Sequence, residues 1–192
     1  MNGGSRPSAL ADQLRTVLLA PEAALAMDVH GRTESAVLVP LFADGAGELH
    51  GVFTRRRHDL RRHPGEISFP GGRREGAEPL LETALREAHE EIGLPPDAVD
   101  VAGALAPTPT LVTGYAIYPF VGVIEPGREW VMAPSEVAEI LELPLRALRA
   151  GRGERRLVRR GIPLRTTTFE VGPHTIWGAT ARIVADLLER LG

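Results

Sequence analysis

The chain has 192 residues and a formal net charge of −3 at pH 7, with 43% hydrophobic and 24% charged residues, which is the composition of an ordinary globular protein. It holds no cysteine, which excludes disulfide bonds, thiolate nucleophiles and cysteine-ligated zinc. The small net charge gives no general attraction to nucleic acid or membranes, and no apolar run approaches the roughly 18 residues of a membrane span. We expect a cytoplasmic protein, because the first residues lack the basic and apolar segments of a signal peptide.

The apolar residues near the N-terminus predict a short helix. Leu10, Leu14, Val17 and Leu18 fit one helical face, so residues 1–30 are expected to form a helical extension. Segments rich in β-branched and apolar residues then predict a sheet. The expected strands cover residues 35–43, 49–54, 66–69, 99–106 and 115–124, with a hairpin from residues 155–160 and 166–171.

Two helices are expected between and after these strands, and a third closes the chain. Residues 79–92 predict a helix with Pro79 in its first turn and Gly93 at its C-terminal stop. Residues 134–141 are expected to form a short helix capped by Ser135. Residues 180–191 are strongly amphipathic. The Pro70-Gly71-Gly72 run is expected to end the strand before it. No linker divides the chain, so we expect one mixed α/β domain over residues 1–192.

The helix at residues 79–92 carries an acidic cluster. At 100° per residue, Glu87, Glu90 and Glu91 lie within about 100° of each other, on a different side from the expected apolar stripe. Carboxylates three and four residues apart repel, so a counterion is expected. Mg²⁺ and Mn²⁺ prefer carboxylate oxygens and often bind substrate phosphates as well. The apolar stripe expected on the other side of the helix consists of Leu81, Leu85, Ala88 and Ile92. The alternative to a metal site is an ordinary surface helix with an excess of negative charge.

The whole segment GRREGAEPLLETALREAHEEIGL, from Gly72 to Leu94, resembles the Nudix box of the Nudix hydrolases. Its matching positions include Gly72, Glu78, Arg86, Glu87, Glu90, Glu91 and Gly93, while Ala88 stands where the pattern usually has a larger aliphatic residue. The resemblance implies a Nudix fold, with a mixed β-sheet sandwiched between α-helices. It also implies metal-dependent hydrolysis of a nucleoside diphosphate linked to another group, with Mg²⁺ or Mn²⁺ as the cofactor.

The same resemblance implies roles for individual residues. Glu87, Glu90 and Glu91 correspond to metal ligands, with the backbone carbonyl of Gly72 beside them. Arg86 would orient one of these carboxylates, and Glu78 is a supporting acidic position. The general base varies within the family. It is left open here between Glu87 and a carboxylate outside the helix, Glu136 or Glu139.

The segment VFTRRRHDLRRHPGEISFPGG, residues 52–72, is similar to the upstream signature of the coenzyme A pyrophosphatase branch of the family. Arg57 departs from that signature, because a small residue is usual there. Coenzyme A carries a 3′-phosphate besides its pyrophosphate, and arginine offers a bidentate fork for phosphate. The resemblance implies substrate binding by Arg55, Arg56, Arg61 and Gly71, and the surrounding Arg57, His58, Arg62 and His63 supply further donors.

The expected reaction is cleavage of coenzyme A, or a derivative, to adenosine 3′,5′-bisphosphate and 4′-phosphopantetheine. One alternative is a Nudix hydrolase for ADP-ribose, dinucleotides or modified nucleoside triphosphates. Another is a non-catalytic nucleotide-binding module, although such a module usually loses the box carboxylates. The expected partner is a small molecule rather than nucleic acid or a membrane. A homodimer is compatible with the sequence, which identifies no interface, no preferred metal and no acyl specificity.

Overall fold

The computed structural model describes residues 9–57, 59, 65–110, 114–159 and 162–192. A mixed sheet of eight strands forms its centre, in the order β3-β2-β1-β7-β5, with β4 also paired to β1, β6 to β7 and β8 to β2. Strands β1 and β7 are parallel, and the other pairs are antiparallel. The strands are β1 (Thr33–Ala43), β2 (Leu49–Arg56), β3 (Ile67–Ser68), β4 (Gly71–Arg73), β5 (Asp100–Ala104), β6 (Thr108–Pro109), β7 (Tyr115–Val123) and β8 (Val137–Pro144).

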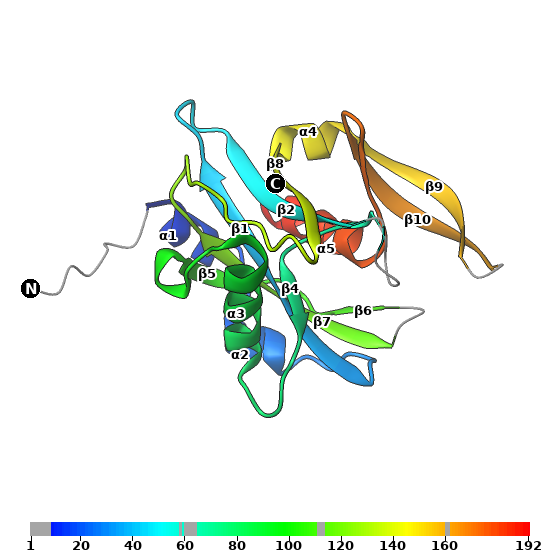
Figure 1. Cartoon of the computed structure of the whole chain (residues 1–192), viewed down its shortest axis with the longest axis horizontal. Helices are drawn as coiled ribbons and strands as arrows, with labels where there is room; N and C mark the ends of the chain where they lie inside the picture. Colours follow the sequence, from blue (N-terminus) through cyan, green and yellow to red (C-terminus); the bar gives the residue numbers. More distant parts are fainter. Residues whose placement is uncertain (1–8, 58, 60–64, 111–113, 160–161) are drawn as a thin grey trace, which may run out of the picture.

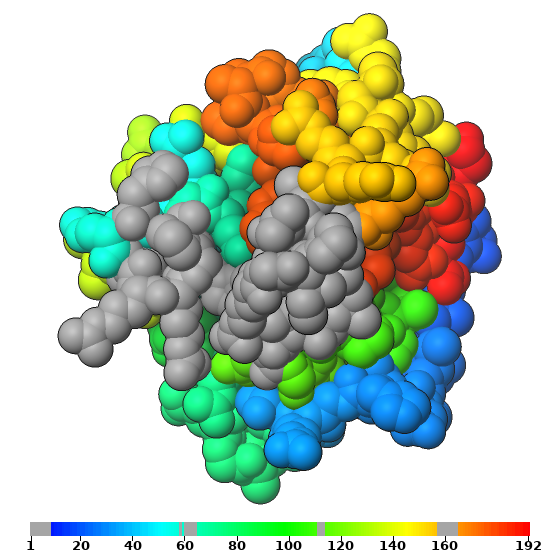
Figure 2. Space-filling model, turned by 90° about the vertical axis from the view of Figure 1, so that its right-hand side faces the viewer, coloured from blue at the N-terminus to red at the C-terminus, as the bar shows by residue number. Residues whose placement is uncertain are grey.

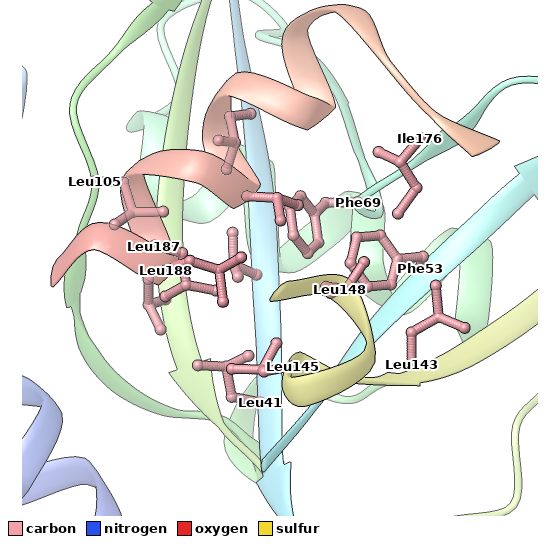
Figure 3. Close-up of a cluster of buried hydrophobic side chains, with 14 of the residues drawn as sticks. Leu41, Phe53, Phe69, Leu105, Leu143, Leu145, Leu148, Ile176, Leu187 and Leu188 are labelled. Atoms are coloured by element: carbon pink, nitrogen blue, oxygen red, sulfur yellow. The ribbon is translucent and has the colours of Figure 1, made fainter. Parts of the chain in front are cut away.

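Helices cover both faces of this sheet, which confirms the expected sandwich (Figure 1). The central strand β1 is apolar along most of its length because both of its faces are buried. One core lies between the sheet and α5, and it includes Phe53, Phe69 and Leu187 (Figure 3). The other lies between the sheet and α3. The helices are α1 (Ala9–Arg15), α2 (Pro21–Leu25), α3 (Leu80–Ile92), α4 (Leu145–Ala150) and α5 (Gly178–Arg190), with a 3₁₀ turn at Pro96–Ala98.

The C-terminal third adds a second, three-stranded antiparallel sheet. Strands β9 (Arg152–Arg159) and β10 (Ile162–Val171) form the expected hairpin, and β11 (His174–Ile176) pairs with β10. Figure 2 shows the coloured part of this hairpin, in yellow and orange, above α5 in red. In the described part of the chain, every helix is too short or too polar to cross a membrane.

The expected helix at residues 134–141 is wrong. Residues Val137–Pro144 form strand β8, which pairs with β2 from His50 to Arg56. Val137 and Leu141 are four residues apart, which suits a helical face, but with Leu143 they also fit the period of two that buries one face of a strand. Pairing along the free edge of β2 decides between these readings, so Ser135 caps no helix.

Smaller corrections concern three other expectations. Gly71 and Gly72 do not simply end a strand, because Gly71–Arg73 pairs with β1 as β4. The buried stripe of α3 includes Ala88 and Ile92 as expected, but in the first half of the helix Leu80 and Ala84 are buried while Leu81 and Leu85 are only partly so. Val17 lies beyond the end of α1 and is exposed.

Gly93 ends α3 as expected, and it also provides room for a later loop. Its φ is 69°, a left-handed conformation that favours glycine, and its N–H donates to the carbonyl of His89. A Cβ on Gly93 would lie 2.7 Å from Cβ of Val131. The loop that carries Val131 therefore packs directly on the C-terminal end of α3.

We predict that Gly93→Ala destabilises the protein more than Gly127→Ala. Both glycines have a left-handed φ, which costs about 1–2 kcal/mol for alanine, but a Cβ on Gly127 would meet nothing within 4 Å. The contact with Val131 should add about 1–3 kcal/mol in the Gly93 variant. Urea unfolding of the two variants measures the difference, and equal losses would show that the loop moves away without cost.

Candidate active site

The side chain of Glu91 lies buried between α3 and β4. Glu91 is 6% exposed, and the N–H of Gly71 donates to its Oε2 over 3.2 Å. Pairing of Gly71 and Gly72 with Val37 and Ala36 of β1 holds this backbone against the helix. Burial raises the pKa of Glu91 to about 8, although the Gly71 hydrogen bond and the charge of Arg56 act in the opposite direction. The fold thus holds a carboxylate out of water with little to neutralise it.

Glu87 lies one turn earlier and rests on Gly72. A Cβ on Gly72 would lie 2.3 Å from both Cδ and Oε1 of Glu87, so any other residue would force this carboxylate to move from its present position. Burial raises the pKa of Glu87, while Arg86 opposes that rise. The two consecutive glycines therefore serve two carboxylates, since Gly71 donates to Glu91 and Gly72 makes space for Glu87.

Arg86 connects the acidic residues of α3 to the loop before the helix. Its Nη2 and Nε lie 2.9 and 3.2 Å from the two carboxylate oxygens of Glu78, and this fork lowers the pKa of Glu78 to about 2. Its Nη1 donates to Glu87 at 3.0 Å and to Glu90 at 3.2 Å. The hydrogen bonds to these carboxylates raise the pKa of Arg86. Arg86 thus contacts three carboxylates at once.

The three box carboxylates have different surroundings. Glu91 is buried, the Glu87 side chain is 18% exposed, and the Glu90 side chain is 57% exposed. Among the described residues, no three His, Asp or Glu side chains are arranged to hold a metal ion. Glu87 and Glu90 each accept from Nη1 of Arg86 through one carboxylate oxygen, which leaves the other oxygen of each side chain for a further ligand. The donor set still fits a hard divalent cation, because it consists of carboxylate oxygens that are partly dehydrated.

The end of β2 and the turn before β8 carry further charged residues near α3. Arg56 Nη1 lies 3.9 Å from Oε2 of Glu136, and both charges affect the pKa of Glu91. Glu136 also contributes to the raised pKa of Glu87. Arg55, by contrast, is 2.9 Å from Glu139, its cross-strand partner. Glu136 is therefore close enough to Glu87 and Glu91 to affect the pKa of both. Glu139, in contrast, forms an ion pair with Arg55.

Not every residue of the expected substrate site can be placed. Gly71 on β4 and Arg56 on β2 lie near Glu91, whereas Arg55 on β2 is paired with Glu139. Arg61 lies outside the described residues, as do His58, Arg62 and His63. The turn at residues 133–136, which packs against the end of α3 and carries Glu136, was not predicted, because a helix was expected to begin at residue 134.

Comparison with known proteins assigns the family. The family model described as "NUDIX domain" matches residues 32–160. A protein from Enterobacter sp. (strain 638), named as an uncharacterized Nudix hydrolase NudL, is 37% identical over 181 residues, which cover 93% of this chain and 92% of the relative. A NudL protein of Cronobacter sakazakii is 39% identical over 162 residues, or 83% of each chain. The chain belongs to the Nudix family and is a Nudix hydrolase, a class of enzymes that generally use divalent metals.

Solved structures agree on the fold. The NUDIX domain of Shewanella oneidensis NrtR, crystallised with ADP ribose, superposes with a TM-score of 0.58 over 89% of this chain and 97% of that domain, at 13% identity. A MutT/nudix family protein from Enterococcus faecalis gives a TM-score of 0.58 over 97% of this chain and 74% of that protein, at 12% identity. At these identities the likeness supports the Nudix fold alone.

We predict that the metal-free protein loses stability as pH rises from about 4.5 to 8, and that Glu91→Gln removes much of this loss. The folded-state pKa of Glu91 is raised to about 8, so between these values the folded protein holds a proton that the unfolded chain has released. The free energy of unfolding therefore falls as pH rises. Glutamine keeps the shape without the charge.

Chemical denaturation in chelator at pH 5 and pH 8 measures this effect. The Glu91→Gln variant should gain stability over the wild type mainly at pH 8. Glu90→Gln is the matched control, because the Glu90 side chain is mostly exposed. An equal gain from both variants at both pH values would contradict the assignment to a buried carboxylate.

Proposed function

We propose that this Nudix hydrolase cleaves the pyrophosphate of coenzyme A, or of a coenzyme A derivative, to adenosine 3′,5′-bisphosphate and 4′-phosphopantetheine. The observation that carries the proposal is the segment at residues 52–72, whose Thr54, Arg56, Gly65 and Phe69 and following Pro-Gly-Gly fall at the spacing of the coenzyme A pyrophosphatase branch. The names of the NudL relatives state no substrate, so the assignment rests on this segment and on its chemistry.

An unsatisfied arginine donor near the acidic cluster supports an anionic substrate. The Nε atom of Arg56, whose charge acts on Glu91, is buried and has no hydrogen-bond partner among the described residues. The Nε atom of Arg55 is open in the same way, although the Nη2 atom of Arg55 is paired with Glu139. Buried polar groups are usually paired, so donors left open next to a candidate phosphate site suit a substrate with several phosphates. Arg61 belongs to the same proposal on the strength of its place in the sequence.

The box residues supply the catalytic groups of this proposal. Glu87, Glu90, Glu91 and the Gly72 carbonyl would hold Mg²⁺ or Mn²⁺, with Arg86 orienting Glu87. When bound, the ion supplies charge neutralisation for the pyrophosphate and lowers the pKa of water. We favour Glu136 over Glu139 as the general base, because Glu136 lies near Glu87 and Glu91 while Glu139 is paired with Arg55. Glu87 is the alternative base. The base accepts a proton as a water oxygen bonds to one phosphorus. The bridging oxygen leaves on the other phosphate with the electrons of its broken P–O bond.

A second candidate is a Nudix hydrolase for ADP-ribose, dinucleotides or modified nucleoside triphosphates. Arg57, in a position where the coenzyme A branch usually has a small residue, is the feature that favours it. The ADP ribose complex of the Shewanella domain belongs to that protein, and at 13% identity it does not choose between substrates. A non-catalytic nucleotide-binding module is disfavoured because the box carboxylates are retained.

The proposed enzyme acts in the cytoplasm on a small-molecule substrate. A homodimer is compatible with this proposal, which depends on no contact between subunits.

The substrate prediction is tested by chromatography of the products formed from coenzyme A, dephospho-coenzyme A and ADP-ribose in parallel, with Mn²⁺ and with chelator. We expect adenosine 3′,5′-bisphosphate to form fastest, and only with metal, because the arginines have an extra phosphate to bind in coenzyme A. Equal or faster turnover of ADP-ribose would keep the Nudix assignment and overturn the substrate.

The metal-site prediction is tested by the activity of Glu91→Gln with either Mg²⁺ or Mn²⁺. Loss of a proposed metal ligand should lower kcat/KM by more than about 100-fold, the upper end of what loss of an outer-shell partner costs. Arg146→Ala on α4 is the control and should stay near wild-type activity. Unchanged activity of Glu91→Gln would rule out its role as a metal ligand.

A further inference from the structure

We propose that Arg57 is a positioning residue that clamps the turn at residues 133–136 and so fixes Glu136 beside the acidic cluster of α3. The proposal rests on the function proposed for Glu136 and concerns how that residue is held, whichever pyrophosphate is the substrate. It gives a role to Arg57, which stands where the expected signature has a small residue.

Arg57 is bound from several sides at once. Its Nε and Nη2 donate to the two carboxylate oxygens of Asp59 at 2.9 and 2.7 Å, which is a bidentate pair. Its Nη1 donates to the carbonyl of Pro134 at 2.6 Å, and its backbone N–H donates to the carbonyl of Glu136 at 3.0 Å. These contacts use three of the five N–H donors of the guanidinium and hold it in one orientation, directed at the turn.

The other side of the same turn is attached to α3. The N–H of Ala133 donates to the carbonyl of Glu91 at 3.0 Å, and the N–H of Val131 donates to that of Ile92 at 3.3 Å. Within the turn, the N–H of Glu136 donates to the carbonyl of Ala133 at 3.1 Å. The turn thus bridges the end of the box helix and the end of β2. Arg57 supplies both of the hydrogen bonds described at the β2 end.

The side chain of Glu136 needs this support from its backbone. It is 54% exposed, and Arg56 is 3.9 Å away, which is too far for a tight hydrogen bond. Its position relative to Glu87 and Glu91 is therefore set mainly by the turn. The Arg57–Asp59 pair is largely exposed, so it should add little to global stability. A displacement of a catalytic group by about 1 Å, however, can cost as much as 10²-fold in rate.

The test is the steady-state kinetics of Arg57→Ala on the best substrate of the panel. We expect kcat to fall between about 10- and 100-fold with KM changed less than about twofold. Arg57→Lys should not restore kcat, because an ammonium cannot make the bidentate pair and reach Pro134 as well. A raised KM with normal kcat, or full rescue by lysine, would mean that Arg57 binds substrate as a charge, and would overturn the proposal.

A double-mutant cycle with Glu136→Gln tests whether Arg57 acts through Glu136. Once Glu136 is removed, Arg57→Ala should lower kcat less than about twofold further. Additive losses would overturn the proposal. If Glu136→Gln alone is as active as the wild type, both the base assignment and the clamp are wrong, while the substrate assignment is unaffected.

Hydrogen–deuterium exchange provides a readout that does not depend on turnover. Arg57→Ala should increase exchange in residues 131–137 and leave α5 unchanged. Arg146→Ala is the matched control, because Arg146 on α4 makes a similar pair of hydrogen bonds to the carboxylate of Glu48, which the substitution removes. Unchanged exchange in residues 131–137 would overturn the clamp even if the protein had no measurable activity.

Discussion

A carboxylate kept out of water is the constraint on which the rest of this site depends. Burying Glu91 costs free energy, and the single N–H of Gly71 compensates for it only in part. Burial follows from the place of Glu91 on α3, where it lies between helix and sheet next to Ile92. The glycines of β4 let the backbone approach closely, because a Cβ at Gly71 would meet the backbone of β1 and a Cβ at Gly72 would meet the Glu87 carboxylate. A fold that accepts this cost has a ready place for a cation.

Arg86 and the turn at residues 133–136 lie on two sides of this acidic cluster. Arg86 keeps Glu87 and Glu90 turned toward itself and ties them to Glu78, which keeps like charges together on one helix. The turn binds the last carbonyls of α3, so the helix end and Glu136 move together. The site therefore combines regular elements, α3 and β4, with one exposed carboxylate, Glu90, whose only described partner is Arg86.

Much of this arrangement could be predicted from the sequence, and the rest depended on long-range contacts. The acidic cluster and Gly93 were predictable because they depend on spacing along one helix. Strand β8 was not, because Val137 and Leu141 fit both periods and pairing with β2 decides. The Gly71–Glu91 hydrogen bond joins residues twenty apart, and the contact between Arg57 and Pro134 joins residues farther apart still. Arg57 was visible only as a departure from a pattern, with no indication of its partner.

The central claim is that the carboxylates of α3 form a divalent cation site, and direct binding of Mn²⁺ tests it most closely. Free Mn²⁺ would be followed by electron paramagnetic resonance as the substrate-free protein is added, for the wild type and for Glu91→Gln. The account predicts saturable binding by the wild type that the substitution weakens by at least about tenfold. Equal binding by both proteins, or none by the wild type, would contradict it.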